Sequence, residues 1–153
     1  MSERHPIIAI TGSSGAGTST VTRTFQNIFR REGIKAAVIE GDSFHRFERK
    51  AMKQRMAEEE AGGNRHFSHF GAEGNMFEQI EALFRDYAAS GQGKSRLYLH
   101  NELEAAPYGQ EPGTFTPWAD LPAGTDLLFY EGLHGAVKTE TVDVARYPDL
   151  LIG

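Results

Sequence analysis

A glycine-rich segment near the N-terminus has the residue types that a phosphate-binding loop requires. It reads Gly-Ser-Ser-Gly-Ala-Gly-Thr-Ser over residues 12–19 and lies between an apolar run and a helical pattern. Glycines let backbone N–H groups converge on an anion, and the N-terminus of a helix adds a partial positive charge. The pattern is close to the G-x-x-x-x-G-K-[ST] loop of nucleoside-triphosphate enzymes, with Thr18 in place of the lysine and Ser19 as the magnesium-binding hydroxyl. We therefore expect this segment to bind phosphate, with the missing cation supplied by another Lys or Arg.

Two other interpretations of the glycine-rich segment stay open. It could be an ordinary turn between a strand and a helix. It could also bind a dinucleotide, because Gly15 and Gly17 fit part of the G-x-G-x-x-G fingerprint and Glu40 ends the second apolar run, where a ribose-binding acid would lie. Thr20 at the third glycine position and the additional Gly12 weaken this alternative.

Two acidic residues follow apolar runs at equivalent places. Asp42 comes after the run at residues 36–39, and Glu131 comes directly after the run at residues 127–130. Because the C-terminal ends of parallel strands share one edge of a sheet, both carboxylates are expected near the glycine-rich segment. One carboxylate could hold magnesium while the other orients or deprotonates an attacking hydroxyl. The alternative is that both are ordinary turn residues.

Three basic residues are spaced four apart after the second apolar run. His45, Arg49 and Lys53 would form one basic stripe on a helix, and Arg and Lys bind phosphate oxygens. The stripe predicts a site for a second, phosphorylated substrate, unless it is only the solvated face of a charged helix. His66 and His69 resemble a metal-binding pair, but no further ligand lies near them in the sequence.

Alternating strands and helices would position these groups. Apolar runs at 7–10, 36–39 and 127–130 are typical of strands covered on both faces, and residues 150–152 begin a further strand. Helical patterns cover residues 18–33, 45–60 and 76–90, and the first has an apolar face formed by Val21, Phe25, Ile28 and Phe29. The less regular segments are a weak strand at 95–100, a proline-containing loop at 102–118 and a short helix at 141–146. This order predicts an α/β fold with a mainly parallel sheet.

The composition excludes several classes of protein. The chain has 153 residues, no cysteine and a formal net charge of −5. The length fits one domain, and the lack of cysteine excludes disulfides, thiolate metal sites and cysteine nucleophiles. A mildly acidic chain is a poor candidate for nucleic-acid binding, and no apolar run approaches the roughly 20 residues of a membrane-spanning helix. We expect a cytoplasmic protein without a nucleic-acid or membrane partner.

Several segments together closely resemble bacterial phosphoribulokinase. The resemblance covers essentially the whole chain and includes the threonine at the lysine position of the loop. The segments are 12–20, 29–33, 40–47, 67–70, 112–116 and 129–137. The resemblance implies a P-loop kinase-like, three-layer α/β fold with a mainly parallel, mixed sheet. It also implies transfer of the ATP γ-phosphoryl group to O1 of D-ribulose 5-phosphate, which gives the ribulose 1,5-bisphosphate of the Calvin cycle.

The resemblance implies a role for each candidate residue. Asp42 would be the base for the substrate hydroxyl, and Ser19 and Glu131 would bind Mg²⁺. The residues that bind the sugar phosphate would be His45, Arg49 and, with less support, Lys53. The residues that bind ATP would be Gly12, Ser13, Ser14, Gly15, Ala16, Gly17, Thr18, Ser19 and Thr20.

The implied partners are ATP, ribulose 5-phosphate and further copies of the same chain. A nicotinamide nucleotide would act as an effector, with Arg31 in its site. Family members are much longer, and the apolar ending at residues 149–153 fits the N-terminal part of a single kinase domain, truncated at the C-terminus. Residues 1–153 would then lack further basic active-site residues and would not be a competent kinase alone.

Other functions stay open. A nucleoside kinase of the uridine kinase type is the nearest alternative, although the basic stripe favours a phosphorylated acceptor. Further alternatives are a hydride-transferring oxidoreductase, a nucleotide-dependent switch and a nucleotide-binding fragment without activity. A guanine-nucleotide switch would need an Asn-Lys-x-Asp motif, which the sequence lacks.

Overall fold

Two compact units make up the described part of the chain. The computed structural model describes residues 5–12, 18–63, 71 and 73–153. The first unit is built from residues 1–41, 77–95 and 119–153, and the second from residues 42–76 and 96–118. The expectation of a single domain over residues 1–153 stays a prediction.

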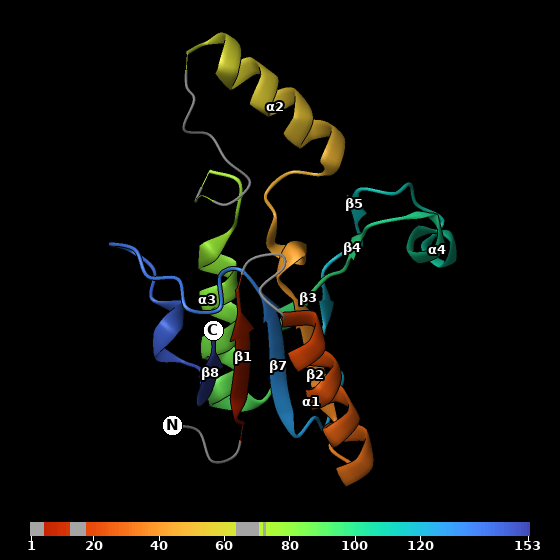
Figure 1. Cartoon of the computed structure of the whole chain (residues 1–153), viewed down its shortest axis with the longest axis vertical. Helices are drawn as coiled ribbons and strands as arrows, with labels where there is room; N and C mark the ends of the chain where they lie inside the picture. The colour runs from red at the N-terminus through yellow and green to blue at the C-terminus, as the bar shows by residue number, and fades with distance from the viewer. Residues whose placement is uncertain (1–4, 13–17, 64–70, 72) are drawn as a thin grey trace. The chain divides into compact units, whose positions relative to one another are not determined.

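A four-stranded parallel sheet is the centre of the first unit (Figure 1). Its strands are arranged β2-β7-β1-β8, and every neighbouring pair is parallel. The strands are β1 (Ile7–Thr11), β2 (Ala36–Glu40), β7 (Leu127–Gly132) and β8 (Leu150–Ile152). The predicted α/β fold with a mainly parallel sheet is therefore confirmed, and β7 continues two residues beyond its predicted end at residue 130.

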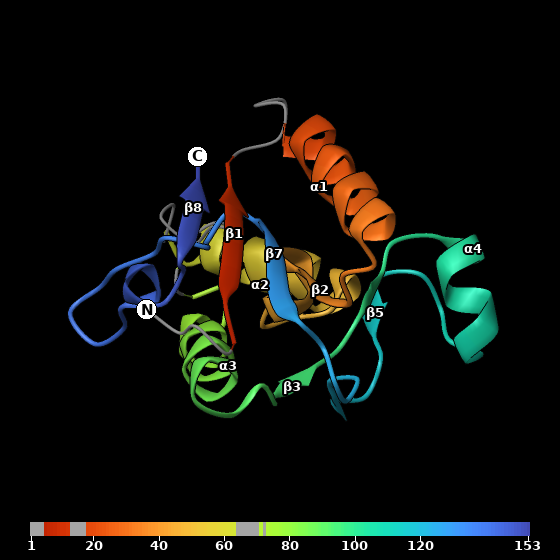
Figure 2. The same ribbon diagram turned by 90° about the horizontal axis from the view of Figure 1, so that it is seen from below.

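Helices cover both faces of this sheet. Figure 2 shows α1 (Thr18–Glu32) on one side and α3 (Phe77–Ser90) on the other. Phe129 of β7 contacts Phe25 and Phe29 of α1, with ring centroids 5.6 and 5.3 Å apart. The next residue, Tyr130, packs against Phe84 of α3 with centroids 5.5 Å apart. Successive strand residues point to opposite faces, and this alternation builds three layers.

Two apolar side chains that were expected in the core are exposed. Ile28 on α1 is 39% exposed and Val38 on β2 is 46% exposed. β2 is an edge strand of the described sheet, and burial alternates along it, with Ala37 and Ile39 buried. The prediction that residues 36–39 are covered on both faces is therefore wrong. An apolar run does not by itself distinguish an edge strand from a central one.

The second unit contains a short hairpin and helical segments. The hairpin pairs β4 (Tyr98–Leu99) with β5 (Thr114–Phe115). Between these strands lie α4 (Glu102–Ala105) and the 3₁₀ turn η2 (Ala106–Tyr108). The prediction of a loop over residues 102–118 is therefore wrong. Its prolines do not prevent local structure, because Pro107 lies at the start of η2, where proline is tolerated.

The helix predicted over residues 45–60 begins later than expected. Residues 41–44 form the 3₁₀ turn η1 (Gly41–Phe44), and α2 runs over Arg49–Ala61. The backbone N–H of Arg46 donates to the Gly74 carbonyl over 2.9 Å, and Glu48 is extended. These two features keep residues 45–48 out of the helix.

Shorter elements complete the first unit. β3 (Lys94–Ser95) pairs antiparallel with β6 (Ala119–Asp120). The 3₁₀ turn η3 (Val144–Arg146) replaces the longer helix expected over residues 141–146. The strand expected over residues 95–100 is divided between β3 and β4. Among the described residues, no helix is both long and apolar enough to cross a bilayer.

The C-terminal ends of β2 and β7 approach each other without room for side chains. A Cβ on Gly132 would lie 2.7 Å from the Tyr130 hydroxyl oxygen and 2.8 Å from the Cα of Gly41. A Cβ on Gly41 would lie 2.6 Å from the same hydroxyl. Tyr130 is fully buried, so its ring cannot move aside without disturbing a close-packed interior. Both positions therefore require glycine.

We predict that Gly132→Ala lowers the free energy of unfolding by about 1–3 kcal/mol, the usual cost of an added group in a packed interior. Chemical denaturation of the complete gene product measures this change. Gly62→Ala is the matched control, because a Cβ there would have its nearest neighbour at 3.5 Å, an ordinary contact. Equal stability of the two variants would contradict the close approach at the strand ends.

Candidate active site

The candidate residues of the first unit lie at the C-terminal edge of its sheet. Glu131 is near the end of β7, in register with Ile10 of β1 and Glu40 of β2. Gly12 follows β1 and donates its N–H to the Gly132 carbonyl over 3.2 Å. The half-buried Glu131 thus lies where the glycine-rich segment begins. Ligands of parallel α/β sheets bind at this edge.

The helix α1 carries the remaining nucleotide and metal candidates. Residues 18–20 form its first turn, and the side chains of Ser19 and Thr20 are exposed. Residues 13–17, which complete the predicted phosphate loop, lie outside the described residues. Arg31, the effector candidate, is exposed in the last turn of α1.

Asp42, in the second unit, lies between two histidines. Its Oδ2 is 2.9 Å from His100 Nε2, and its Oδ1 is 3.4 Å from His45 Nε2. The contact with His45, followed by that with His100, outweighs the opposing effect of burial and lowers the pKa of Asp42 from 3.8 to about 2. The side chain is still 54% exposed. Asp42 is therefore ionised at neutral pH and accessible to a further hydrogen-bond donor.

A buried asparagine orients His45. Asn75 is 1% exposed, and its Nδ2 donates to the Gly71 carbonyl over 3.0 Å. This bond turns the amide so that its Oδ1 faces His45 and accepts from Nδ1 at 3.0 Å. His45 Nε2 is left facing Asp42.

His100 has a carboxylate at each ring nitrogen. Its Nε2 meets Asp42, and its Nδ1 lies 2.9 Å from Glu104 Oε2. The same oxygen of Glu104 accepts the backbone N–H of His100 over 2.5 Å. Burial alone would lower the pKa of His100, but the hydrogen bonds to Asp42 and Glu104 outweigh it and raise the pKa above its ordinary 6.5. The backbone hydrogen bond and then the ring contact from His100 lower the pKa of Glu104.

Local structure holds this cluster in place. Asn101 caps α4, and its Oδ1 accepts the backbone N–H of Glu104 over 3.0 Å. The ring of Tyr98, from β4, lies edge-on to His100 and to His45, with centroids 4.7 and 5.9 Å apart. Both histidines therefore rest against the hairpin that also leads into α4.

Arg49 is attached to the same cluster through the backbone. Its N–H donates to the Gly113 carbonyl over 2.9 Å, and its Nη2 donates to the His100 carbonyl over 2.8 Å. Its Cζ is 5.9 Å from the centre of the Tyr98 ring. Gly113 has a φ of 82°, and a Cβ there would lie 2.6 Å from the Cβ of Arg49. The lack of a side chain at Gly113 leaves room for the Arg49 side chain, and the bond from Nη2 to the His100 carbonyl places the guanidinium beside His100.

The predicted basic stripe forms only in part. Arg49 and Lys53 lie one turn apart on α2, and both are exposed. His45 precedes the helix, so the prediction that the three side chains share one helical face is wrong. His45 instead meets Asp42 within the turn after β2, because α2 does not begin until Arg49.

The sequence-based prediction missed His100, Glu104 and Asn75. Asn101-Glu102-Leu103-Glu104 contains an N-cap residue followed three positions later by Glu, which is a signal for the start of a helix. That signal places Glu104 one turn from His100. The pair His66 and His69 lies outside the described residues, and among the described residues no group of three or more His, Cys, Asp or Glu side chains could hold a metal ion.

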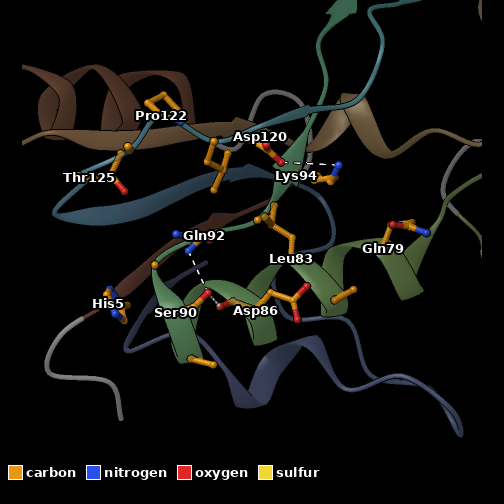
Figure 3. A pocket seen from close by; sticks show the side chains of 17 residues that line it. His5, Gln79, Leu83, Asp86, Ser90, Gln92, Lys94, Asp120, Pro122 and Thr125 are labelled. Carbon is orange, nitrogen blue, oxygen red and sulfur yellow. Dashed lines mark hydrogen bonds and ion pairs between the residues drawn. The ribbon is translucent and has the colours of Figure 1, made fainter.

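A cavity of about 810 Å³ lies elsewhere in the first unit (Figure 3). Its walls come from one side of α3, between Gln79 and Ser90, and from residues 91–94 and 120–125. Lys94 Nζ lies 3.7 Å from Asp120 Oδ1 on this wall. His5, which also lines the cavity, precedes β1, whereas Gly12 follows that strand. The cavity is therefore at the opposite edge of the sheet from Glu131 and is not part of the candidate active site.

Comparison with known proteins identifies the family. The sequence model of a protein family, described as the phosphoribulokinase / uridine kinase family, matches residues 7–153. The chain belongs to this family. The chromosomal phosphoribulokinase of Cupriavidus necator is 69% identical over 153 residues, which are 100% of this chain and 52% of that protein. The chain thus spans about half the length of the curated relatives that it matches.

Two solved structures of other proteins have the same fold as this chain. Phosphoribulokinase from Rhodobacter spheroides matches with a TM-score of 0.87 and 49% identity, over 98% of this chain and 50% of that chain. A possible uridine kinase from Bacillus stearothermophilus matches with a TM-score of 0.67 and 19% identity, over 99% and 71% of the two chains. The second match shows the fold alone. The predicted P-loop kinase-like fold is confirmed, and the family assignment favours a phosphate loop over a dinucleotide fingerprint.

We predict that Glu104→Gln lowers the pKa of His100 towards 6.5, because it removes the negative charge at Nδ1. NMR titration of the His100 ring in the complete gene product measures this pKa. Glu102→Gln is the matched control, because Glu102 is exposed on the same short helix. The contact between Glu104 and His100 is contradicted if the two variants give the same His100 pKa.

Proposed function

We propose that the protein is an ATP-dependent kinase that converts D-ribulose 5-phosphate to ribulose 1,5-bisphosphate. The observation that carries the proposal is the environment of Asp42, an ionised and half-exposed carboxylate held by two histidines. Phosphorylation of a hydroxyl needs such a group to orient the hydroxyl and accept its proton. The 69% identity to a protein named phosphoribulokinase supports the choice of acceptor.

In the proposed reaction, O1 of the sugar forms a bond to the γ-phosphorus of ATP. The bond from that phosphorus to the β–γ bridging oxygen breaks, and ADP leaves with the electron pair. The hydroxyl proton passes to Asp42. Phosphoryl transfer has a loose transition state, so catalysis depends on positioning and charge stabilisation more than on a strong base. With a pKa of about 2, Asp42 is ionised at neutral pH, so it can accept a hydrogen bond from the hydroxyl and take its proton as the new P–O bond forms.

The proposed nucleotide site consists of residues 12–20, with Mg²⁺ held by Ser19 and Glu131. A hydroxyl and a carboxylate are hard oxygen ligands, which Mg²⁺ prefers. Both residues belong to the first unit, one in the first turn of α1 and the other at the C-terminal edge of the sheet. The ion would neutralise charge on the β- and γ-phosphates.

The proposed site for the acceptor phosphate consists of His45, Arg49 and Lys53. Arg49 and Lys53 are exposed on successive turns of α2, and Arg49 is fixed beside His100. Cationic side chains of this kind bind phosphate oxygens through charge-assisted hydrogen bonds. They favour a sugar phosphate over a neutral nucleoside, the acceptor expected for the uridine kinase alternative.

Further properties are proposed for the complete protein. We propose a cytoplasmic homo-oligomer that works in the Calvin cycle and responds to a nicotinamide nucleotide at a site that includes Arg31. Arg31 is exposed at the end of α1 and is accessible to an anionic ligand.

The acceptor specificity of ADP release tests the proposed function. The complete gene product is assayed with ATP and Mg²⁺, with either ribulose 5-phosphate or uridine as the acceptor. We expect turnover on the order of 1–100 s⁻¹ with the sugar phosphate, typical of kinases, and little with uridine. A preference for uridine would overturn the proposal in favour of a nucleoside kinase. Nucleotide binding without release of ADP would overturn it in favour of a binding protein.

We predict that Asp42→Asn lowers kcat by at least roughly 100-fold, because a positioned general base contributes about 10²–10⁴ in rate. The KM for ATP should change little. Steady-state kinetics of the complete gene product gives both constants, and Asp120→Asn, far from the strand ends that bind ligands, is the control. Near-normal turnover of the Asp42 variant would remove this residue as the base.

We predict that Arg49→Gln raises the KM for ribulose 5-phosphate by about ten- to a hundredfold, because a lost charge-assisted phosphate contact is worth roughly 1.5–3 kcal/mol. The KM for ATP should rise far less. The control is Arg55→Gln on the same helix, whose guanidinium pairs with Glu59 at 2.9 Å. Equal increases in both KM values for the Arg49 variant would place this residue outside the acceptor site.

A further inference from the structure

Arg96 forms hydrogen bonds to the backbone of the turn that carries Asp42 and His45. Its Nε donates to the Ser43 carbonyl over 2.8 Å, and its Nη2 donates to the His45 carbonyl over 2.7 Å. One guanidinium therefore holds two carbonyls, one on each side of the fully buried Phe44. Asp42 immediately precedes this pair of carbonyls in the chain.

Two aromatic rings hold the guanidinium in turn. The Cζ of Arg96 is 3.6 Å from the ring centre of Phe115 and 4.6 Å from that of Trp118. Trp118 also packs on Phe44, with ring centroids 6.0 Å apart. Burial lowers the pKa of Arg96 to about 10, against the opposing charge of Glu48, so the group is still cationic at neutral pH. Phe115 and Trp118 therefore hold the guanidinium of Arg96 in the position from which it binds the two carbonyls of the turn.

We propose that Arg96 is a positioning residue for phosphoryl transfer, which acts by fixing the backbone that presents the carboxylate of Asp42 and the ring of His45. This proposal rests on the proposed function of Asp42 as the acceptor of the hydroxyl proton. Arg96 makes its contacts to backbone carbonyls and aromatic rings, so it acts through its neighbours and has no chemical step of its own.

Arginine suits this task better than any other side chain. Its planar fork reaches two acceptors at once and stacks on aromatic rings, whereas lysine offers one compact ammonium group. Loss of the fork removes two of the hydrogen bonds that hold the turn, alongside the bond from the Met76 N–H to the Phe44 carbonyl over 2.8 Å. A misplacement of about 1 Å in an active site costs on the order of 100-fold in rate. Asp42 belongs to η1, whereas His100 lies outside this turn. A shift of the turn would therefore change the distance between the two side chains.

Two variants test the proposal in the complete gene product. Arg96→Met removes the charge and both donors, and Arg96→Lys keeps the charge but lacks the fork. We expect kcat with ribulose 5-phosphate to fall by on the order of 100-fold in Arg96→Met and less in Arg96→Lys. The KM for ATP should change little in both. The control variants are Arg85→Met and Arg85→Lys, at an exposed position on α3.

The pKa of His100, measured by NMR without substrates, distinguishes positioning from a general effect of charge. Removal of a nearby cation would by itself raise the pKa of a histidine. Loss of the Asp42 contact would lower it, because that contact is one of the causes of the raised value. We therefore expect the His100 pKa to fall in both Arg96 variants and to stay constant in the Arg85 variants.

The outcomes separate this proposal from the proposed function. A folded Arg96 variant with a normal kcat and a normal or raised His100 pKa would overturn the positioning role. If Arg96→Met does not fold, Arg96→Lys decides by the same two measurements. The wild-type protein could phosphorylate no sugar while the His100 pKa still falls in the variants. That result would overturn the proposed function, but it would still support the conclusion that Arg96 fixes the backbone of the turn.

Discussion

One imidazole between two carboxylates organises the second unit. His100 meets Asp42 at Nε2 and Glu104 at Nδ1, both at 2.9 Å, and these contacts join the turn after β2 to the helix α4. Other local contacts of this unit support the arrangement. Asn101 places Glu104 by capping α4, and Arg49 binds the carbonyl of His100 itself. The turn after β2 and the hairpin β4–β5 are thus connected by contacts between charged side chains. These contacts need the carboxylates to be ionised and His100 to be protonated.

The charges set a pH window for this connection. The folded pKa of Asp42 is about 2 and lies below its unfolded value of 3.8, so its contribution to stability is complete above 3.8 and is lost as pH falls towards 2. The folded pKa of His100 is raised above 6.5, so its contribution is complete below 6.5 and is lost as pH rises through the folded pKa. The ion pair is therefore intact between these limits. Above the upper limit Asp42 stays ionised, but the ring of His100 is neutral and no longer forms an ion pair with it.

Helices and strands with clear sequence patterns could be predicted from the sequence. The cluster of Asp42, His45 and His100 could not. α1 ends at Glu32, directly before Gly33, which has a φ of 66°, and the apolar side chains that recur at helical spacing along α3 are buried. The error at His45 arises because residues with helical spacing are pulled out of the helix by a bond to Gly74, about 30 positions away. His100 is separated from Asp42 by 58 residues, so no local pattern reveals their contact.

The two units divide the proposed chemistry between them. The first unit contains the parallel sheet and the proposed nucleotide site, with Ser19 in the first turn of α1 and Glu131 at the end of β7. The acceptor residues instead depend on the hairpin β4–β5, where Tyr98 packs on two histidines and Gly113 admits Arg49 at close range. A side chain at Gly113 would displace Arg49 while leaving the strand ends of the sheet untouched. Changes in acceptor specificity should therefore arise in the hairpin and its turns more readily than in the glycine-rich segment.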